Sequence, residues 1–101
     1  MNIVKNMNGN DLTVALEGRL DTGTAPQLEA EMKNAVTAEV SSLTFDCAKL
    51  EYISSAGLRV LLSVNKTMLR NGKESVRVIN CNEIVREVFE VTGFSDILNI
   101  A

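Results

Sequence analysis

The sequence has little of the chemistry on which most enzymes depend. It contains no histidine and no tryptophan, one proline, one tyrosine, three phenylalanines and two cysteines. Without histidine there is no Ser-His-Asp triad and no histidine-assisted cysteine nucleophile, and a zinc site would need both cysteines together with carboxylates. No GxGxxG motif occurs, and the Gly72-Lys73 pair lacks the spacing of a P-loop. We therefore expect a protein that is not an enzyme and that has no metal and no cofactor.

The excess of negative over positive charge is also small. Thirteen acidic and ten basic side chains give a net charge of −3, and the lysines and arginines are scattered along the sequence with no basic stripe. Because a phosphate backbone requires a basic surface, we expect no nucleic-acid partner. No apolar run reaches the roughly 18–20 residues that span a bilayer, and the N-terminus lacks the apolar stretch of a signal peptide. We therefore expect a cytoplasmic protein with no membrane partner.

The length indicates a single domain, and the cysteine usage indicates that its thiols are reduced. The 101 residues suit a single domain and leave no room for a second. In a cytoplasmic chain, Cys47 and Cys81 are expected to be reduced and buried near strand ends rather than joined in a disulfide.

Two periodicities divide the chain into elements. Alternating apolar residues predict strands over residues 3–7, 11–17, 43–47 and 75–80, and residues 97–100 are expected to add an edge strand or pack on the core. Helical spacing predicts helices that begin near residues 24, 54 and 82, the first with a capping box from Thr24 to Gln27. Residues 48–53 are expected to be a loop. The order ββαβαβα, with an optional last strand, predicts an α/β fold: one layer of mixed, mainly parallel sheet with helices packed on it.

The second and third predicted helices each carry an apolar stripe at helical spacing, which indicates the side that faces the core. These inward positions are Leu58, Leu61, Leu62, Asn65, Met68 and Leu69 in the second helix, and Ile84, Val85, Val88 and Phe89 in the third.

The segment from residue 51 to 62 joins a parallel strand to a helix N-terminus, where α/β sheets carry functional loops. Ser54 or Ser55 there has two interpretations. One is a helix N-cap, which contributes about 1 kcal/mol. The other is a phosphoacceptor, whose added charge of about −2 suits a helix N-terminus. Gly57 would leave this turn open to the backbone of a partner. The residues alone leave both interpretations of the serines open.

Two motifs resemble those of a known family. Tyr52-Ile53-Ser54-Ser55-Ala56-Gly57-Leu58 resembles the signature loop of STAS domains, which are shared by anti-sigma factor antagonists and sulphate-transporter tails. Gly18-Arg19-Leu20-Asp21, followed by Ala25, resembles the second marker of that family at the expected distance upstream. The resemblance covers essentially the whole chain, including the order of elements, and implies a single STAS domain over residues 1–101.

The resemblance also implies a function, that of a stand-alone bacterial anti-sigma factor antagonist. In such members, the unphosphorylated domain binds an anti-sigma factor that is also a serine kinase. The kinase phosphorylates the serine at the head of the second helix, which dissociates the complex, and a serine phosphatase restores the domain. By position, the phosphoacceptor here is Ser55. The implied partner-binding residues are Asp21, Thr22, Ser54, Ala56, Gly57, Leu58 and Arg59.

The site departs from the family pattern at two positions. Well-known members often have aspartate immediately before the acceptor and serine or threonine after it, whereas this chain has Ser54 and Ala56. Ser54 removes a negative charge and adds a second hydroxyl, so it is an alternative acceptor or the cap, although Ser55 is preferred. The alternative function is a phosphorylation-independent STAS interaction module in a transport, lipid-trafficking or scaffold complex.

Overall fold

A computed structural model describes residues 1–101 as one five-stranded sheet with three α-helices. The strands pair in the order β1-β2-β3-β4-β5, with β1 antiparallel to β2 and all other pairs parallel. This is the predicted mixed sheet, with a short last strand. The elements are β1 (Asn2–Asn8), β2 (Asp11–Leu20), α1 (Ala25–Ala35), β3 (Ser42–Ile53), α2 (Ser55–Arg70), β4 (Arg77–Ile79), α3 (Glu83–Val91), the 3₁₀ turn η1 (Phe94–Asp96) and β5 (Asn99–Ile100).

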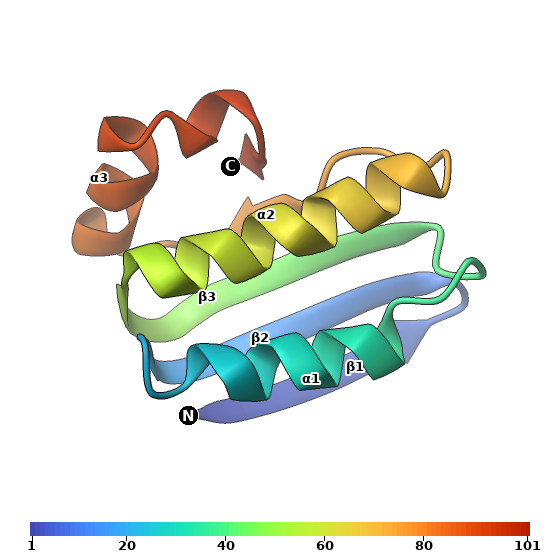
Figure 1. The fold of residues 1–101 in the computed structure, drawn as a ribbon, viewed down its shortest axis with the longest axis horizontal. Coiled ribbons are helices and arrows are strands. Elements are labelled where there is room, and N and C mark those ends of the chain that lie inside the picture. The colour runs from blue at the N-terminus through green and yellow to red at the C-terminus, as the bar shows by residue number, and fades with distance from the viewer.

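The helices form a layer over one face of the sheet. α1 and α2 lie side by side and begin at the same end of the sheet, because each follows the carboxyl end of a parallel strand (Figure 1). α3 packs against β3 and lies beyond α2 in this view. No helix combines the length and the apolar character that a bilayer crossing requires.

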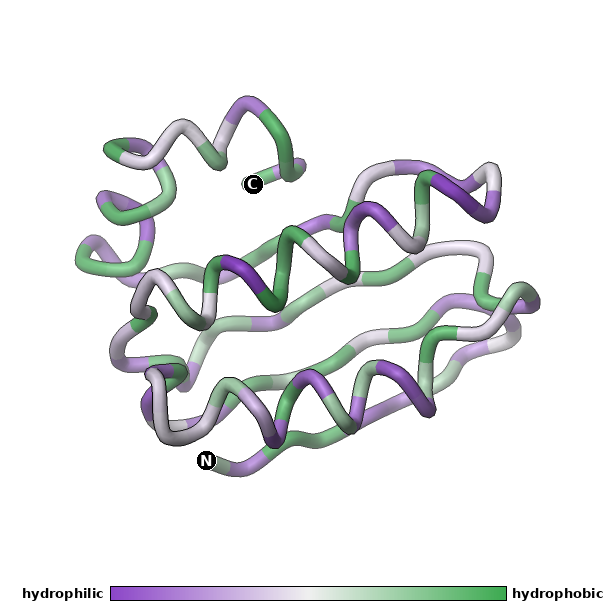
Figure 2. The backbone as a smooth tube through the Cα atoms, in the orientation of Figure 1, coloured by the Kyte–Doolittle hydropathy of each residue, from purple (hydrophilic) through white to green (hydrophobic).

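The core lies between the sheet and this helical layer. In β2, Leu12, Val14 and Leu16 are buried, whereas the alternate residues Thr13 and Ala15 are only half-buried on the opposite face. Figure 2 shows that hydrophobic and hydrophilic residues are interspersed along the strands and the helices. The period of two therefore predicts correctly which face of β2 and of the first half of β3 carries the core.

The turn from β2 into α1 differs from the sequence prediction. Thr24 is the N-cap residue of α1, but its side chain makes no capping hydrogen bond. Instead, its Oγ1 donates to the Arg19 carbonyl at 2.8 Å and accepts from the Asp21 amide at 2.9 Å. The predicted capping box is therefore wrong, because the Thr24 hydroxyl ties the end of β2 to the turn.

β3 is longer than predicted, and residues 48–53 are strand rather than loop. Lys49, Leu50, Tyr52 and Ile53 all pair with β2, but the register shifts twice, so that β3 contains extra, bulged residues. The shifts break the two-residue alternation of buried side chains in β3. A pattern search that requires strict alternation ends this strand too early.

The inward face of α2 is rotated slightly from the predicted stripe. Leu69 is 50% exposed and Leu62 only half-buried, because α1 packs against the side of α2 that carries Val60 and Val64. In α3, the prediction fails for Ile84, which is 60% exposed. The buried residues of α2 are Gly57, Leu58, Val60, Leu61, Val64, Asn65 and Met68, and those of α3 are Val85 and Phe89.

Asn65 is the one polar residue buried in the core, and its Oδ1 accepts a hydrogen bond from the Val76 amide at 2.8 Å. We expect Asn65→Leu to lower the free energy of unfolding by about 1–3 kcal/mol, because the buried amide loses its acceptor. Asn34 is exposed on α1, and Asn34→Leu is expected to change stability by less than about 0.5 kcal/mol. Urea denaturation measures both variants, and equal stability of the two would contradict this role.

Candidate functional site

The N-terminus of α2 lies where β2 and β3 end together. The last pair of the two strands joins Leu20 to Ile53, and the Ser54 amide donates to the Leu20 carbonyl at 2.9 Å. The β2–α1 turn and the first turn of α2 are therefore neighbours at the carboxyl edge of the parallel strands, the edge that carries functional loops in α/β sheets. The two sequence motifs meet in one surface.

Ser54, rather than Ser55, is the N-cap of α2. The Ser54 Oγ accepts a long hydrogen bond of 3.4 Å from the Gly57 amide, and its carbonyl accepts from the Leu58 amide at 2.9 Å. Ser55 is the first residue of the helix and is exposed, whereas Ser54 is half-buried. The fold thus gives the capping role to one serine and leaves the neighbouring hydroxyl accessible from solvent.

Gly57 and Leu58 are buried in the folded chain, and their predicted contact with a partner stays a prediction. A Cβ on Gly57 would lie 2.6 Å from the Leu20 Cγ and 3.0 Å from the Ile53 Cγ1. The glycine therefore allows the first turn of α2 to lie directly on the sheet, rather than leaving room for a partner backbone. Its contribution to the site is indirect, because it determines where Ser55 and Ala56 lie.

Asp21 has a structural role and is also accessible. Its Oδ1 accepts from the amides of Gly23 and Thr24 at 3.0 and 3.2 Å, and its Oδ2 lies 3.8 Å from the Arg19 Nε. Arg19 stacks over the Tyr52 ring, 4.6 Å from its centroid, across the paired strands. The Asp21 carboxylate is 37% exposed, so it adds a negative charge to the surface where β2 ends.

Three of the remaining site residues line one hollow. Thr22, Ala56 and Arg59 border a cavity of about 400 Å³ between the first turns of α1 and α2, together with Glu29 and Ser63. The structure thus brings together the residues that the two separate motifs contribute.

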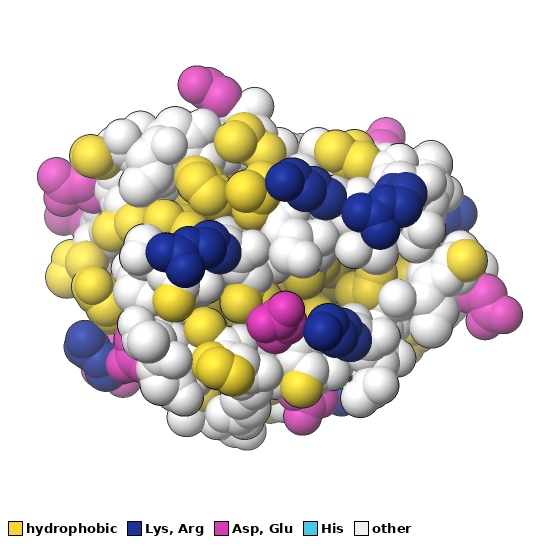
Figure 3. All heavy atoms as spheres, in the orientation of Figure 1, with side chains coloured by type: hydrophobic (Ala, Val, Ile, Leu, Met, Phe, Trp, Pro, Cys, Tyr) yellow, Lys and Arg dark blue, Asp and Glu magenta, His cyan; other side chains and the backbone are white.

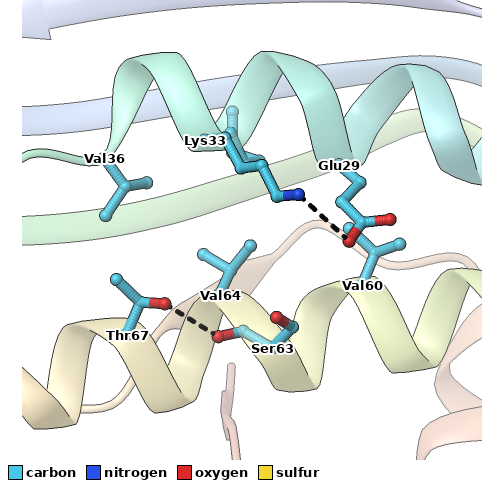
Figure 4. A pocket seen from close by; sticks show the side chains of 8 residues that line it. Glu29, Lys33, Val36, Val60, Ser63, Val64 and Thr67 are labelled. Atoms are coloured by element: carbon cyan, nitrogen blue, oxygen red, sulfur yellow. Dashed lines mark hydrogen bonds and ion pairs between the residues drawn. The ribbon is translucent and has the colours of Figure 1, made fainter.

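The hollow continues along the two helices as a shallow groove. Glu29, Val60 and Ser63 also border a second depression of about 190 Å³ further along α1 and α2 (Figure 4). There the Lys33 Nζ lies 3.9 Å from Glu29, and Thr67 donates to the Ser63 carbonyl at 3.2 Å. Sequence reasoning missed this groove, because its walls come from two helices whose relative rotation the pattern does not specify.

A scan against family models finds the STAS domain model over residues 2–101. The chain belongs to the STAS domain family. The match covers the strands, the helices and the serine-bearing turn described above, and it confirms the family that the two motifs indicate.

Curated relatives of this STAS domain are named as anti-sigma factor antagonists. BtrV of Bordetella bronchiseptica, whose name includes that description, is 40% identical over 90 residues, which cover 89% of this chain and 77% of that protein. The anti-sigma-B factor antagonist of Bacillus subtilis is 29% identical over 102 residues, covering 100% of this chain and 91% of the relative. The likeness therefore extends over most of the length of both relatives.

Solved structures show the same fold. An anti-sigma factor antagonist from Mycobacterium paratuberculosis matches with a TM-score of 0.84 and 24% identity, covering 98% of this chain and 83% of that one. The antagonist SpoIIAA in its unphosphorylated form matches with a TM-score of 0.84 and 20% identity, covering 99% and 88%. At these identities the likeness establishes the shared α/β fold.

The thiols of Cys47 and Cys81 are both free, Cys47 fully buried and Cys81 half-buried. A hydrogen bond with Cys81 and desolvation raise the pKa of the Cys47 thiol. The same hydrogen bond lowers the pKa of the Cys81 thiol, against burial and with help from the positive charge of Arg86. Cys81 is therefore the more reactive thiol of the pair. No group of three or more acidic or cysteine side chains is arranged to hold a metal ion.

Because Gly57 lies against Leu20 and Ile53, we expect Gly57→Ala to destabilise the protein by about 1–3 kcal/mol, the usual effect of overpacking a core. Ser63→Ala, on the exposed side of the same helix, is the matched control and should change stability by less than about 0.5 kcal/mol. Thermal unfolding measures both. A Gly57→Ala variant with an unchanged melting temperature would show that α2 can move away from the sheet freely.

The thiol pair predicts a pH dependence of alkylation. Since the pKa of Cys81 is lowered, its reaction with iodoacetamide should reach half of its maximal rate below the pH expected for an ordinary thiol, and Cys47 should stay unmodified in the folded protein. Cys47→Val removes the main cause of the shift, so the midpoint for Cys81 should move to higher pH. Peptide mass spectrometry after timed alkylation measures both rates. Faster labelling of Cys47 than of Cys81 would contradict the assignment.

Proposed function

We propose that this STAS domain is an anti-sigma factor antagonist that binds an anti-sigma factor when Ser55 is unphosphorylated and is released when Ser55 is phosphorylated. The observation that carries the proposal is the separation of the two serines: Ser54 caps α2, and Ser55 is exposed beside it. A kinase can reach Ser55 without unfolding the cap. The names of the curated relatives support the antagonist role.

The local charge suits a phosphorylated Ser55. At the first position of α2, the free amides of the first turn and the helix dipole favour an anion. The phosphate would therefore be accepted by the fold without a change of structure. Among the neighbours in fold, SpoIIAA has been solved in a phosphorylated as well as an unphosphorylated form.

Release follows from what the phosphate does to a docked partner. A neutral hydroxyl at Ser55 can be covered by a partner, whereas a phosphate with a charge of about −2 must be desolvated. A buried charge without a partner costs about 3–4 kcal/mol. Since each 1.4 kcal/mol weakens binding tenfold, this cost is enough to release a partner of sub-micromolar affinity.

The proposal assigns the remaining roles to other proteins. The partner is an anti-sigma factor with serine kinase activity, a serine phosphatase reverses the modification, and the STAS domain itself catalyses nothing and acts in the cytoplasm. The surface that meets the kinase lies at the carboxyl edge of the sheet and consists of the exposed Thr22, Ser55 and Arg59 and the half-buried Asp21 and Ala56.

The first test is phosphosite mapping by mass spectrometry of protein isolated from its own cells, with the variants Ser55→Ala and Ser54→Ala alongside. We expect phosphate on Ser55 that persists in Ser54→Ala and disappears in Ser55→Ala. Phosphate confined to Ser54 would reassign the acceptor. Unmodified protein under both growth and stress conditions would favour the phosphorylation-independent module.

The second test measures binding to the purified anti-sigma factor by calorimetry. Ser55→Ala should bind like the unphosphorylated wild type, and Ser55→Asp should bind about 100-fold more weakly if the charge contributes roughly 3 kcal/mol. Ser41→Asp places the same charge on an exposed serine just before β3, at the opposite end of that strand from Ser55, and controls for a nonspecific effect. Equal affinities of Ser55→Ala and Ser55→Asp would exclude the switch.

A further inference from the structure

The exposed basic side chains of α2 have no acidic partners. Elsewhere in the chain, four basic residues form ion pairs: Lys5 with Glu31, Arg19 with Asp21, Lys33 with Glu29 and Lys49 with Glu17. Arg59, Lys66 and Arg70 are all exposed and form no ion pair, and the α2 sequence contains no aspartate or glutamate. Lys73, Arg77 and Arg86 also form no ion pair, but they do not share one helix. α2 therefore carries three basic and no acidic side chains in a chain whose net charge is −3.

The three basic residues lie on the same side of the helix as Ser55. At 100° per residue, Ser55, Arg59, Lys66 and Arg70 fall within an arc of about 60°, and they extend over about 22 Å of helix length. Basic groups are spread along α2 in Figure 3, with apolar side chains between them. The absence of a basic stripe, as judged from the linear sequence, is therefore wrong for the folded helix.

Two of these three positions do not stabilise α2 itself. Lys66 and Arg70 are four residues apart, where like charges repel. Arg59 lies near the positive end of the helix dipole, where a cation is disfavoured. Only Arg70, in the last turn, is where the dipole favours a cation. The stability of the isolated domain thus accounts for one of the three positions.

We propose that this basic ridge, defined as Arg59, Lys66 and Arg70, binds an acidic protein surface that belongs to the partner docked at Ser55. The proposal rests on the proposed function and adds the chemistry of the partner: carboxylate side chains arranged along roughly 20 Å, beginning one helical turn from the phosphoacceptor. Complementary charges on this scale raise the rate of association and fix the orientation of the complex.

Other polyanions fit the ridge less well. A nucleic acid would meet the repulsion of the net negative charge, and no exposed aromatic side chain on α2 offers a stacking platform. A membrane would require an apolar face of α2 to be available for insertion, whereas that face is buried against the sheet. Leu62, half-buried, and Leu69, 50% exposed, lie beside the basic groups, and such a mixture of apolar and basic contacts is typical of a protein interface.

The ridge also couples to phosphorylation. Ser55 and Arg59 are four residues apart on one face of the helix, so a phosphate on Ser55 lies within reach of the Arg59 guanidinium. That pairing would remove the nearest cation from the acidic partner surface. Phosphorylation would then weaken docking in two ways, by adding a buried charge and by neutralising the head of the ridge.

The test compares two double variants that change the net charge equally. Lys66→Glu with Arg70→Glu reverses the ridge, and Lys5→Glu with Lys49→Glu reverses two lysines on other elements. Stopped-flow association with the purified anti-sigma factor kinase, at about 50 mM and about 500 mM salt, reports the electrostatic contribution. At low salt the ridge variant should associate about tenfold more slowly than the control variant, and the difference should largely vanish at high salt.

The outcomes separate the two proposals. Equal rates for the two double variants would overturn the ridge and leave the switch at Ser55 intact. If the wild type binds no such kinase, the proposed function fails. The ridge is then judged by NMR titration with a decaglutamate peptide, a DNA duplex and anionic phospholipid vesicles. Amide shifts confined to Arg59–Arg70 with the acidic peptide would support it, and no shifts, or stronger binding of DNA or vesicles, would overturn it.

Discussion

The placement of the site depends on one contact, the close approach of the first turn of α2 to the ends of β2 and β3. Gly57 makes this approach possible, because any larger residue would overlap Leu20 and Ile53. The Ser54 amide reinforces the contact through its hydrogen bond to the Leu20 carbonyl. These two interactions fix the start of α2 relative to the β2–α1 turn. The positions of Ser55, Ala56 and Arg59 follow from them by helical geometry.

The β2–α1 turn lies on the other side of the same contact, and side chains that hydrogen-bond to its backbone stabilise it. The Asp21 carboxylate accepts two amides of its own turn, and the Thr24 hydroxyl bridges the Arg19 carbonyl and the Asp21 amide. Replacing Asp21 would therefore alter the turn as well as the charge of the surface. A loss of partner binding in such a variant could come from either effect, whereas Ser55 can be changed without touching any of these bonds.

The sequence alone predicts the order of elements and the inward faces of the long strands, because both depend on local periodicity. It misjudges details that depend on how elements meet. The bulges of β3 remove the alternation that would mark residues 48–53 as strand. The rotation of α2 against α1 exposes Leu69 and buries Val60 and Val64. The basic ridge was missed for the same reason, since Arg59, Lys66 and Arg70 are scattered in the chain and aligned only on the folded helix.

Ser54 changes the electrostatics of the proposed switch relative to a site with aspartate at that position. A neutral cap leaves the positive end of the α2 dipole without a carboxylate, and Arg59 adds a cation one turn further. A phosphate on Ser55 would therefore enter a locally positive environment and be stabilised by the domain itself. The penalty would fall on the complex, where the phosphate must be desolvated and Arg59 is no longer free for the partner. This favours a switch in which the phosphorylated domain is stable and only the docked state is disfavoured.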